Sequence, residues 1–518
     1  MTVIEIADSK TPGVEDLSAI RRKNLTRSTL IGTGWLLVQN IGTRLISFGS
    51  QILLAKLLAP SDFGIIGLAW TVTTVASVVA NFGVDDVLLQ RQNTLRFWTY
   101  PAFITSLGLG LLSFLGVVAI TPLAAMIYRS PVLHTILPLM ALSMPLTALS
   151  TVPMAKLRSE LNFRFIAAYT TVELAAIQLL TIALAACGFG IYSFAIPVPV
   201  MALVRVITFW MMARPRLGRL RLKQLRMMGS NSAAVFGTKI LTAAVGQGDY
   251  FVLGLVAAKP VVGAYFFAFR LAIQPVQLLA GNLSNVLFPI LAQLRNEPKQ
   301  QGEAALRASR VLAFVVMPYC FLQAAVARPL LTLVFGDKWL AAIPLVEILS
   351  IGLAFDAVSW IAGALLQARG EFRASFVYSC VFFPVFFGMV TLGALSFSAT
   401  GVAVAVSLFY IAFAPVYSYT IFRKLGISPT DVATIFAPPV IFAALASLVG
   451  LSLGALASPG NLAKVAIIGI SGSAAYLALL RVFAPSIFQH LLTRARNLAH
   501  DRLHRMMAAG PVARAPRP

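Results

Sequence analysis

The chain contains fourteen apolar runs, each about as long as a bilayer's hydrocarbon core requires of a helix, which is about 20 residues. In lipid every backbone polar group must be satisfied internally, so only helices and closed barrels cross a membrane. The runs lack the period-two alternation of a barrel strand. The sequence therefore predicts an all-α integral membrane protein, with spans at about 29–56, 63–83, 98–127, 132–153, 163–186, 189–213, 230–257, 261–290, 308–333, 341–367, 374–396, 400–422, 432–454 and 461–483.

Composition supports lipid as the main solvent of this chain. Of its 518 residues, 58% are hydrophobic and only 11% are charged, whereas a soluble domain carries about 25% charged residues. So few charges cannot cover the surface of a soluble protein of this size.

The positive residues that give the chain its net charge of +23 are distributed unequally between the two sides of the predicted membrane. Of the 41 Lys and Arg residues, 31 fall on the side of the membrane that holds the N-terminus, six on the other side and four inside spans. Positively charged segments stay in the cytoplasm. We therefore expect both termini to be cytoplasmic, and we expect no nucleic-acid partner.

A basic segment, "RPRLGRLRLKQLRMMG" at 214–229, divides the chain into two halves. Like "IFQHLLTRARNLAHDRLHRMM" at 487–507 in the basic tail, it places its leucines near one helical face, as a helix lying on an anionic lipid surface does, so anionic membrane lipids are expected partners. The predicted organisation is a cytoplasmic tail at 1–28, an N-lobe of six spans at 29–213, the linker at 214–229, a C-lobe of six spans at 230–422, two further spans at 423–485 and the tail at 486–518.

The two halves share a weak repeat. Gly-Thr-cation occurs at 42–44 and at 237–239, and Gly64 and Gly263 stand near the start of the next span in each half. Six spans is an even number, so both halves begin on the same side, as parallel repeats related by a pseudo-twofold axis do. Two such bundles facing each other enclose a central cavity.

Seven ionisable residues lie inside the predicted spans, where each costs at least about 2.5–3.5 kcal/mol unless it faces protein or water. Asp249 and Arg270 lie at similar depths in spans 7 and 8. They either form an ion pair between neighbouring helices or line the cavity. The full set is Arg44, Glu173, Arg205, Lys239, Asp249, Arg270 and Asp356.

Arg44 and Lys239 begin equivalent spans and have no acid nearby in the sequence. A cation on each side of the cavity suits a compact anion with several oxygens, above all a phosphate. The alternative is that both bind backbone carbonyls or reach an interface.

Glu173 and Arg205 lie in adjacent spans and are candidates for pairing with each other. Asp356 is a candidate either for coupling transport to a proton or sodium ion or for helix packing. The four histidines have no partner at ligand or triad spacing, and no P-loop, HExxH or GxSxG motif is present. The expectation is a protein with no catalytic residues, no metal and no cofactor.

Two hairpins resemble a known family. They are "LLAKLLAPSDFGIIGLAWTVTTVASVVANFGVDDVLLQRQ" at 53–92, with its L-x-P-x-D-F-G turn, and "DYFVLGLVAAKPVVGAYFFAFRLAIQPVQLLAGNLSNVLFPILAQLR" at 249–295, with D-x-x-x-L-G and V-x-F-P steps. Both resemble the polysaccharide-transporter, or lipopolysaccharide-biosynthesis flippase, family of the multidrug/oligosaccharidyl-lipid/polysaccharide exporter superfamily.

The resemblance implies a flippase that carries an undecaprenyl-diphosphate-linked oligosaccharide, an O-antigen or exopolysaccharide unit, across a bacterial inner membrane by alternating access. It implies a cavity lined by helices 1, 2, 7 and 8, with Arg44, Lys239 and Arg270 on cavity helices as diphosphate ligands. Polysaccharide polymerase and assembly proteins are the implied partners. The alternatives are a membrane-embedded polymerase or acyltransferase, a multidrug or small-cation antiporter, and a scaffold for glycan assembly.

Overall fold

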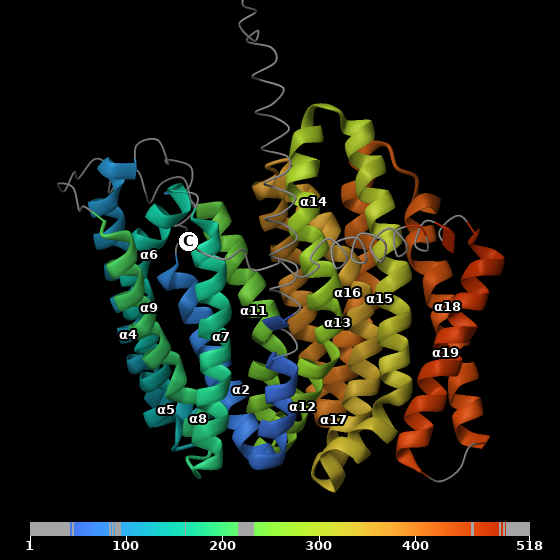
Figure 1. Cartoon of the computed structure of the whole chain (residues 1–518), viewed down its shortest axis with the longest axis horizontal. Helices are drawn as coiled ribbons and strands as arrows, with labels where there is room; N and C mark the ends of the chain where they lie inside the picture. Colours follow the sequence, from blue (N-terminus) through green and yellow to red (C-terminus); the bar gives the residue numbers. More distant parts are fainter. Residues whose placement is uncertain are drawn as a thin grey trace, which may run out of the picture.

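The computed structural model describes residues 42–43, 46–81, 84, 88, 95–160, 162–215, 233–456, 460–485, 488–489 and 493. Within these residues the chain forms helices joined by short turns, and no strand is present among them (Figure 1). The predicted all-α class is therefore confirmed. Arg44, the linker 216–232 and most of the tail beyond residue 485 lie outside the described residues.

The first group of helices, blue to green in Figure 1, contains the N-terminal half of the chain. α4 is long and carries two internal prolines, while α5 and α6, like α8 and α9, are separated by a single residue. The described elements are a short helix Ile46–Leu57, α2 (Pro60–Ala80), α4 (Leu95–Ile127), α5 (Leu133–Ala141), α6 (Ser143–Ser159), α7 (Phe163–Ala186), α8 (Tyr192–Ala195) and α9 (Pro197–Ala213).

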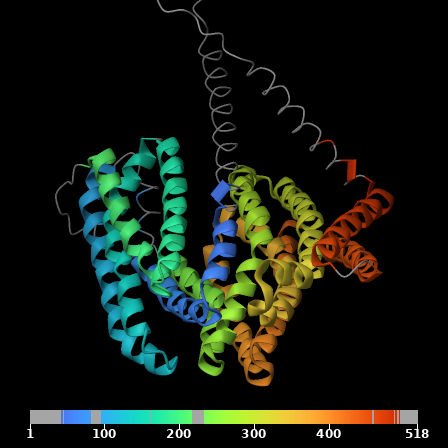
Figure 2. The same cartoon turned by 60° about the horizontal axis from the view of Figure 1, so that its bottom comes forward.

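The second group lies beside it, with the last two helices at the outer edge (Figures 1 and 2). Its elements are α11 (Ala233–Val256), α12 (Lys259–Ala272), α13 (Gln274–Val276), the π-helix η2 (Gln277–Gly281), α14 (Asn282–Gln293), η3 (Leu294–Asn296), α15 (Pro298–Phe335), η4 (Gly336–Ala342), α16 (Ile343–Ala368), α17 (Phe372–Phe422), η5 (Arg423–Leu425), α18 (Pro429–Leu456) and α19 (Asn461–Phe483).

The described residues contain ten stretches that are long and apolar enough to cross a membrane. One of them includes α17, whose 51 residues would extend about 77 Å as one helix, more than twice the thickness of a bilayer core. Phe397 and Ser398 have non-helical backbone angles in its middle, with φ of 53° at Ser398. A Cβ on Gly393 would lie 2.3 Å from the carbonyl oxygen of Gly401, so the two halves of α17 pack side by side as a hairpin.

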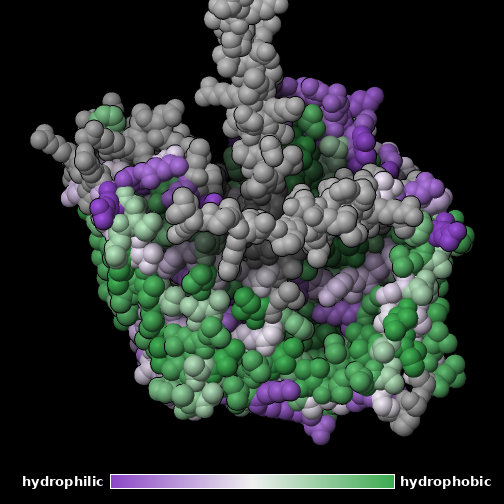
Figure 3. All heavy atoms as spheres, viewed as in Figure 1, coloured by the Kyte–Doolittle hydropathy of each residue, from purple (hydrophilic) through white to green (hydrophobic). Residues whose placement is uncertain are grey.

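The surface agrees with a multi-pass membrane protein. Figure 3 shows hydrophobic residues over the middle and lower part of the face in view, with hydrophilic residues gathered along the upper edge and in a small group at the lower edge. The count of fourteen spans stays a prediction, because only part of the first predicted span, 29–56, is described.

The two lobes meet where α2 and α12 begin. A Cβ on Gly64 would lie 2.1 Å from the carbonyl oxygen of Lys259, and one on Gly263 would lie 1.8 Å from that of Pro60. Pro60 precedes Gly64 by four residues, as Lys259 precedes Gly263. The contact is therefore reciprocal, as contacts about a twofold axis are, and only glycine allows the backbones to approach this closely.

The turn between α15 and α16 covers the same end of the molecule, which we call the contact end. The indole Nε1 of Trp339 donates a 3.0 Å hydrogen bond to the carbonyl oxygen of Ala55, and the Lys338 ammonium donates to that of Leu58. Both carbonyls lie in the last turn of the helix that begins at Ile46 or just after it, where they have no helical partner. The Trp339 ring also packs on Phe63 of α2 and Phe267 of α12, at centroid distances of 5.2 and 4.0 Å.

Charged side chains join the helices at the opposite end. Glu371, just before α17, accepts hydrogen bonds of 2.7 Å from Arg369 and from Lys424. These two bonds hold the pKa of Glu371 below its usual range. Arg310 of α15 pairs with Asp431 of α18 at 3.0 Å, so the last two helices are fixed to the second lobe by polar contacts as well as by packing.

The reciprocal glycine contact predicts that Gly263→Ala destabilises the protein. The added Cβ meets backbone, which cannot rotate away, and we expect the unfolding midpoint in detergent to fall by about 5 °C or more. Gly388→Ala is the control, because a Cβ there meets nothing within 4 Å, and its midpoint should stay level or rise. Equal midpoints for the two variants would show that the close approach is not required.

Candidate substrate site between the lobes

Arg270 lies at the interface between the two lobes. Its guanidinium carbon is 4.7 Å from the ring centroid of Trp70 on α2 and 5.5 Å from that of Phe266, one turn earlier on α12. A cation over an aromatic face gains about 0.5–2 kcal/mol, more when water is excluded. The pairing brings a cation of the C-terminal half onto a tryptophan of the N-terminal half, and it leaves Arg270 half-buried.

The local sequence explains this position of Arg270. It stands in the last turn of α12. Directly after it Pro275 and the π-helix η2 interrupt regular helical hydrogen bonding. π-helical turns of this kind occur frequently at functional sites.

The other two predicted diphosphate ligands are Lys239 and Arg44. Lys239 lies on α11 with an exposed side chain. Arg44 lies outside the described residues. The structure therefore places one of the three predicted cations at the lobe interface.

Asp249 is buried, with 2% of its surface exposed. Its carboxylate accepts a 2.8 Å hydrogen bond from the Tyr265 hydroxyl and a 2.9 Å bond from the backbone N–H of Tyr250. Among the ion pairs between described residues, none joins Asp249 to Arg270. The carboxylate is satisfied by a tyrosine of α12, a partner that the sequence pattern did not indicate.

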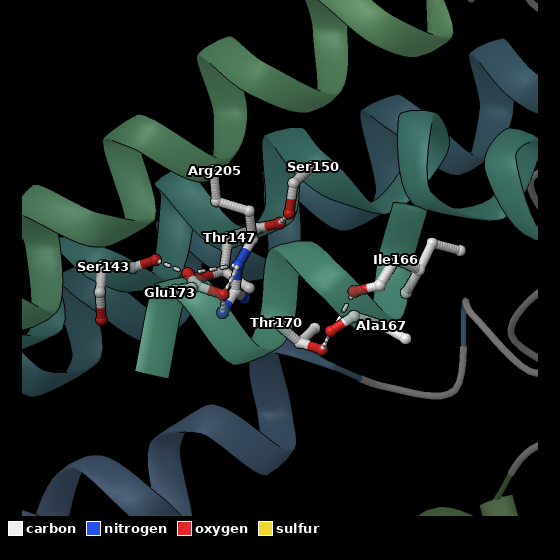
Figure 4. A network of polar contacts seen from close by, with 8 residues as sticks. All are labelled: Ser143, Thr147, Ser150, Ile166, Ala167, Thr170, Glu173 and Arg205. Carbon is white, nitrogen blue, oxygen red and sulfur yellow. Dashed lines mark hydrogen bonds and ion pairs between the residues drawn. The ribbon is translucent and has the colours of Figure 1, made fainter. Parts of the chain in front are cut away.

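Glu173 of α7 and Arg205 of α9 form a two-pronged ion pair. The Arg205 Nε lies 2.9 Å from one carboxylate oxygen and Nη2 lies 2.8 Å from the other. Figure 4 shows the pair facing one another, drawn together with hydroxyl side chains of the neighbouring helix α6. Glu173 is 4% exposed. Because Glu173 and Arg205 neutralise each other, the first lobe can hold two charged side chains at membrane depth.

Asp356 of α16 is half-buried in the second lobe. Its two carboxylate oxygens accept hydrogen bonds from the Ser359 hydroxyl at 2.7 Å and from the Trp360 indole at 3.0 Å. The Ser284 hydroxyl of α14 in turn donates to the carbonyl oxygen of Trp360 at 3.0 Å. In the described part of the chain, no group of three or more His, Cys, Asp or Glu side chains could hold a metal ion.

A pocket of about 230 Å³ lies in the first lobe between α2 and α6. We call it the α2–α6 pocket. Its wall includes Trp70, whose ring also contacts the guanidinium of Arg270. Sequence reasoning missed it because its polar residues are uncharged; they are Thr73, Thr74, Ser77, Asn81, Ser143 and Thr147.

The fold and these polar positions define a multi-pass α-helical membrane protein with two helical lobes. The chain has a TM-score of 0.72 to a solved structure of the lipid II flippase MurJ in an inward closed conformation, at 14% identity, covering 87% of this chain and 99% of that one. It has a TM-score of 0.59 to an inward-facing multidrug resistance MATE family transporter of the MOP superfamily, at 14% identity, covering 76% and 95%.

The sequence comparisons define the family more narrowly. A sequence profile described as "Polysaccharide biosynthesis protein" matches residues 53–344. The chain belongs to this family of polysaccharide biosynthesis proteins. It is 25% identical over 485 residues to the succinoglycan biosynthesis transport protein ExoT of Rhizobium meliloti, covering 92% of this chain and 97% of that protein.

The buried ion pair predicts a strong energetic coupling between Glu173 and Arg205. Glu173→Gln or Arg205→Met alone leaves one charge without its partner, and each should lower the free energy of unfolding by about 3–5 kcal/mol. The double variant should recover most of that loss, as measured by a double-mutant cycle in detergent. Glu160→Gln, which breaks the exposed pair with Lys156, should cost less than about 1 kcal/mol. A double variant as unstable as the sum of both singles would contradict mutual compensation.

Proposed function

We propose that this protein is a flippase for an undecaprenyl-diphosphate-linked oligosaccharide, an O-antigen or exopolysaccharide repeat unit, and that it works by alternating access. The position of Arg270 carries the proposal, since the cation lies where the two lobes face each other. Membership of a polysaccharide biosynthesis family supports it, as does the similarity to a succinoglycan biosynthesis transport protein. So does the fold shared with a lipid II flippase, whose substrate is also a lipid-linked saccharide.

A diphosphate explains why a cation is needed there. Unaided passage would take two phosphates and many hydroxyls through hydrocarbon, where unpaired polar groups cost several kcal/mol each. Arg270 offers a planar fork that matches phosphate oxygens, and Lys239 and Arg44 are proposed to add positive charge from the cavity helices. The polyprenyl tail would stay in the lipid while the head group crosses between the lobes.

We propose a bacterial inner membrane with both termini in the cytoplasm, on the strength of the charge asymmetry between the two sets of connecting segments. In that orientation the contact end faces outward, and the structure corresponds to a state sealed on the outside. Trp339 and Lys338, which cover the last turn of the helix ending at Leu57, would then separate from it when the protein opens outward.

The proposed diphosphate site predicts that Arg270→Gln reduces transport at least tenfold. The substitution keeps a similar side-chain volume but removes the charge, so the diphosphate loses its charge-assisted hydrogen bonds. Surface glycan would be measured in cells carrying only the variant, together with the lipid-linked precursor that accumulates inside them. Lys239→Gln and Arg44→Gln are expected to act in the same direction.

Arg328→Gln is the matched control, because this arginine is highly exposed on α15, away from the lobe interface. Its variant should export normally. Arg270→Lys should keep part of the activity, since it keeps the charge and loses the fork. Full export by the Gln variants of Arg44, Lys239 and Arg270 would refute the diphosphate site.

We further propose that Asp356 couples transport to a proton or sodium ion. Asp249, which accepts a hydrogen bond from the Tyr265 hydroxyl, is proposed to have a structural role. Asp356→Asn should abolish the acceleration of lipid transport by an imposed ion gradient in proteoliposomes while leaving exchange without a gradient. Asp249→Asn should chiefly lower protein stability. An unchanged gradient response in Asp356→Asn would contradict the coupling role.

A further inference from the structure

The α2–α6 pocket is lined by one polar face of α2. Trp70, Thr74, Ser77 and Asn81 follow each other at spacings of four, three and four residues, and Thr73 lies three residues after Trp70, which places all five on the same side of the helix. The facing helix α6 adds two hydroxyls, from Ser143 and Thr147. Such a run of hydroxyls within a bundle of apolar helices, with the exposed amide of Asn81 at its end, indicates a polar ligand.

These hydroxyls are available to a ligand as hydrogen-bond acceptors. The Thr73, Ser77 and Thr147 hydroxyls each donate their proton to a carbonyl of their own helix, at 2.9, 2.7 and 2.7 Å. A hydroxyl that donates in this way keeps lone pairs free on its oxygen. The Thr74 hydroxyl makes no hydrogen bond to any described residue, so it can both donate and accept.

The size and charge of the pocket restrict the ligand further. Its volume is about 230 Å³. That is too small for an oligosaccharide or a drug-sized molecule, for which pockets of about 300–1,000 Å³ are usual. None of the twelve described residues that line it is ionisable, so the pocket suits one neutral, hydroxyl-rich ring rather than a cation.

Trp70 connects this pocket to the proposed diphosphate site. The same indole lines the pocket and lies 4.7 Å from the guanidinium carbon of Arg270. In a lipid-linked saccharide only one sugar is bonded directly to the diphosphate. With the diphosphate at Arg270, that sugar is the part of the substrate that reaches Trp70.

We propose that the α2–α6 pocket binds the sugar residue attached directly to the diphosphate, with Trp70 against the apolar face of its ring and the hydroxyls of Thr74, Ser77 and Thr147 on its hydroxyl groups. This assignment rests on the proposed flippase function. Under this proposal the protein recognises the first sugar of the glycan, while the sugars beyond it remain outside the pocket.

The test compares two lipids on the full-length protein in nanodiscs. One is undecaprenyl diphosphate, and the other carries a single hexose, used in turn as glucose, galactose and N-acetylglucosamine. The wild type should bind at least one hexose lipid about tenfold more tightly than the bare diphosphate. Thr74→Val and Thr147→Val should each reduce this gain by about three- to tenfold and leave binding of the bare diphosphate unchanged.

Thr332→Val is the matched control. Its hydroxyl donates to the carbonyl of Arg328 on its own helix, as that of Thr73 does to Ala69, but it lies on α15 and does not line the pocket. This variant should bind both lipids as the wild type does. Unchanged binding there shows that replacing a helical threonine is harmless in itself.

The outcomes separate the two proposals. Equal affinity of the wild type for the bare diphosphate and for all three hexose lipids would overturn the sugar pocket while leaving the diphosphate site intact. The sugar pocket would also be overturned if Thr74→Val and Thr147→Val kept the full gain. Failure of the bare diphosphate to bind, or equal binding by Arg270→Gln, would instead overturn the proposed function.

Discussion

The approach of two backbones at Gly64 and Gly263 organises the rest of the structure. Because neither residue has a side chain, α2 and α12 can touch through carbonyl oxygens and amides at their first turns. That contact sets the angle at which the two lobes face each other. It also brings Trp70 and Arg270, each a few residues further along its helix, to the same depth and within 4.7 Å of one another.

Five of the ionisable side chains in the predicted spans are accommodated in three different ways. Glu173 and Arg205 neutralise each other within the first lobe. Asp249 and Asp356 are held by hydrogen-bond donors, Tyr265 for one and Ser359 with Trp360 for the other. Arg270 lies over aromatic rings at the boundary between the lobes.

Much of the fold could be predicted from the sequence because lipid imposes a length and a polarity on each helix. The predicted spans 163–186 and 461–483 coincide with α7 and α19, and the break between 396 and 400 lies at Phe397 and Ser398. The candidate site was harder to predict from the sequence. A charge in an apolar run is conspicuous, whereas Trp70 and the threonines after it look like ordinary span residues. Their shared face at spacings of three and four was the available signal, and the aromatic rings around Arg270 come from residues that tertiary packing alone brings together.

α2 carries the lobe contact at one end and the polar face of the pocket toward the other. Gly64 and Asn81 are 17 residues apart on a continuous helix, or about 26 Å at 1.5 Å per residue. A tilt of about 10° pivoting at Gly64 would therefore swing the far end through about 4–5 Å. A small rotation of α2 at Gly64 would therefore produce a larger displacement at the other end of the helix. The pocket-lining side chains there would move with it.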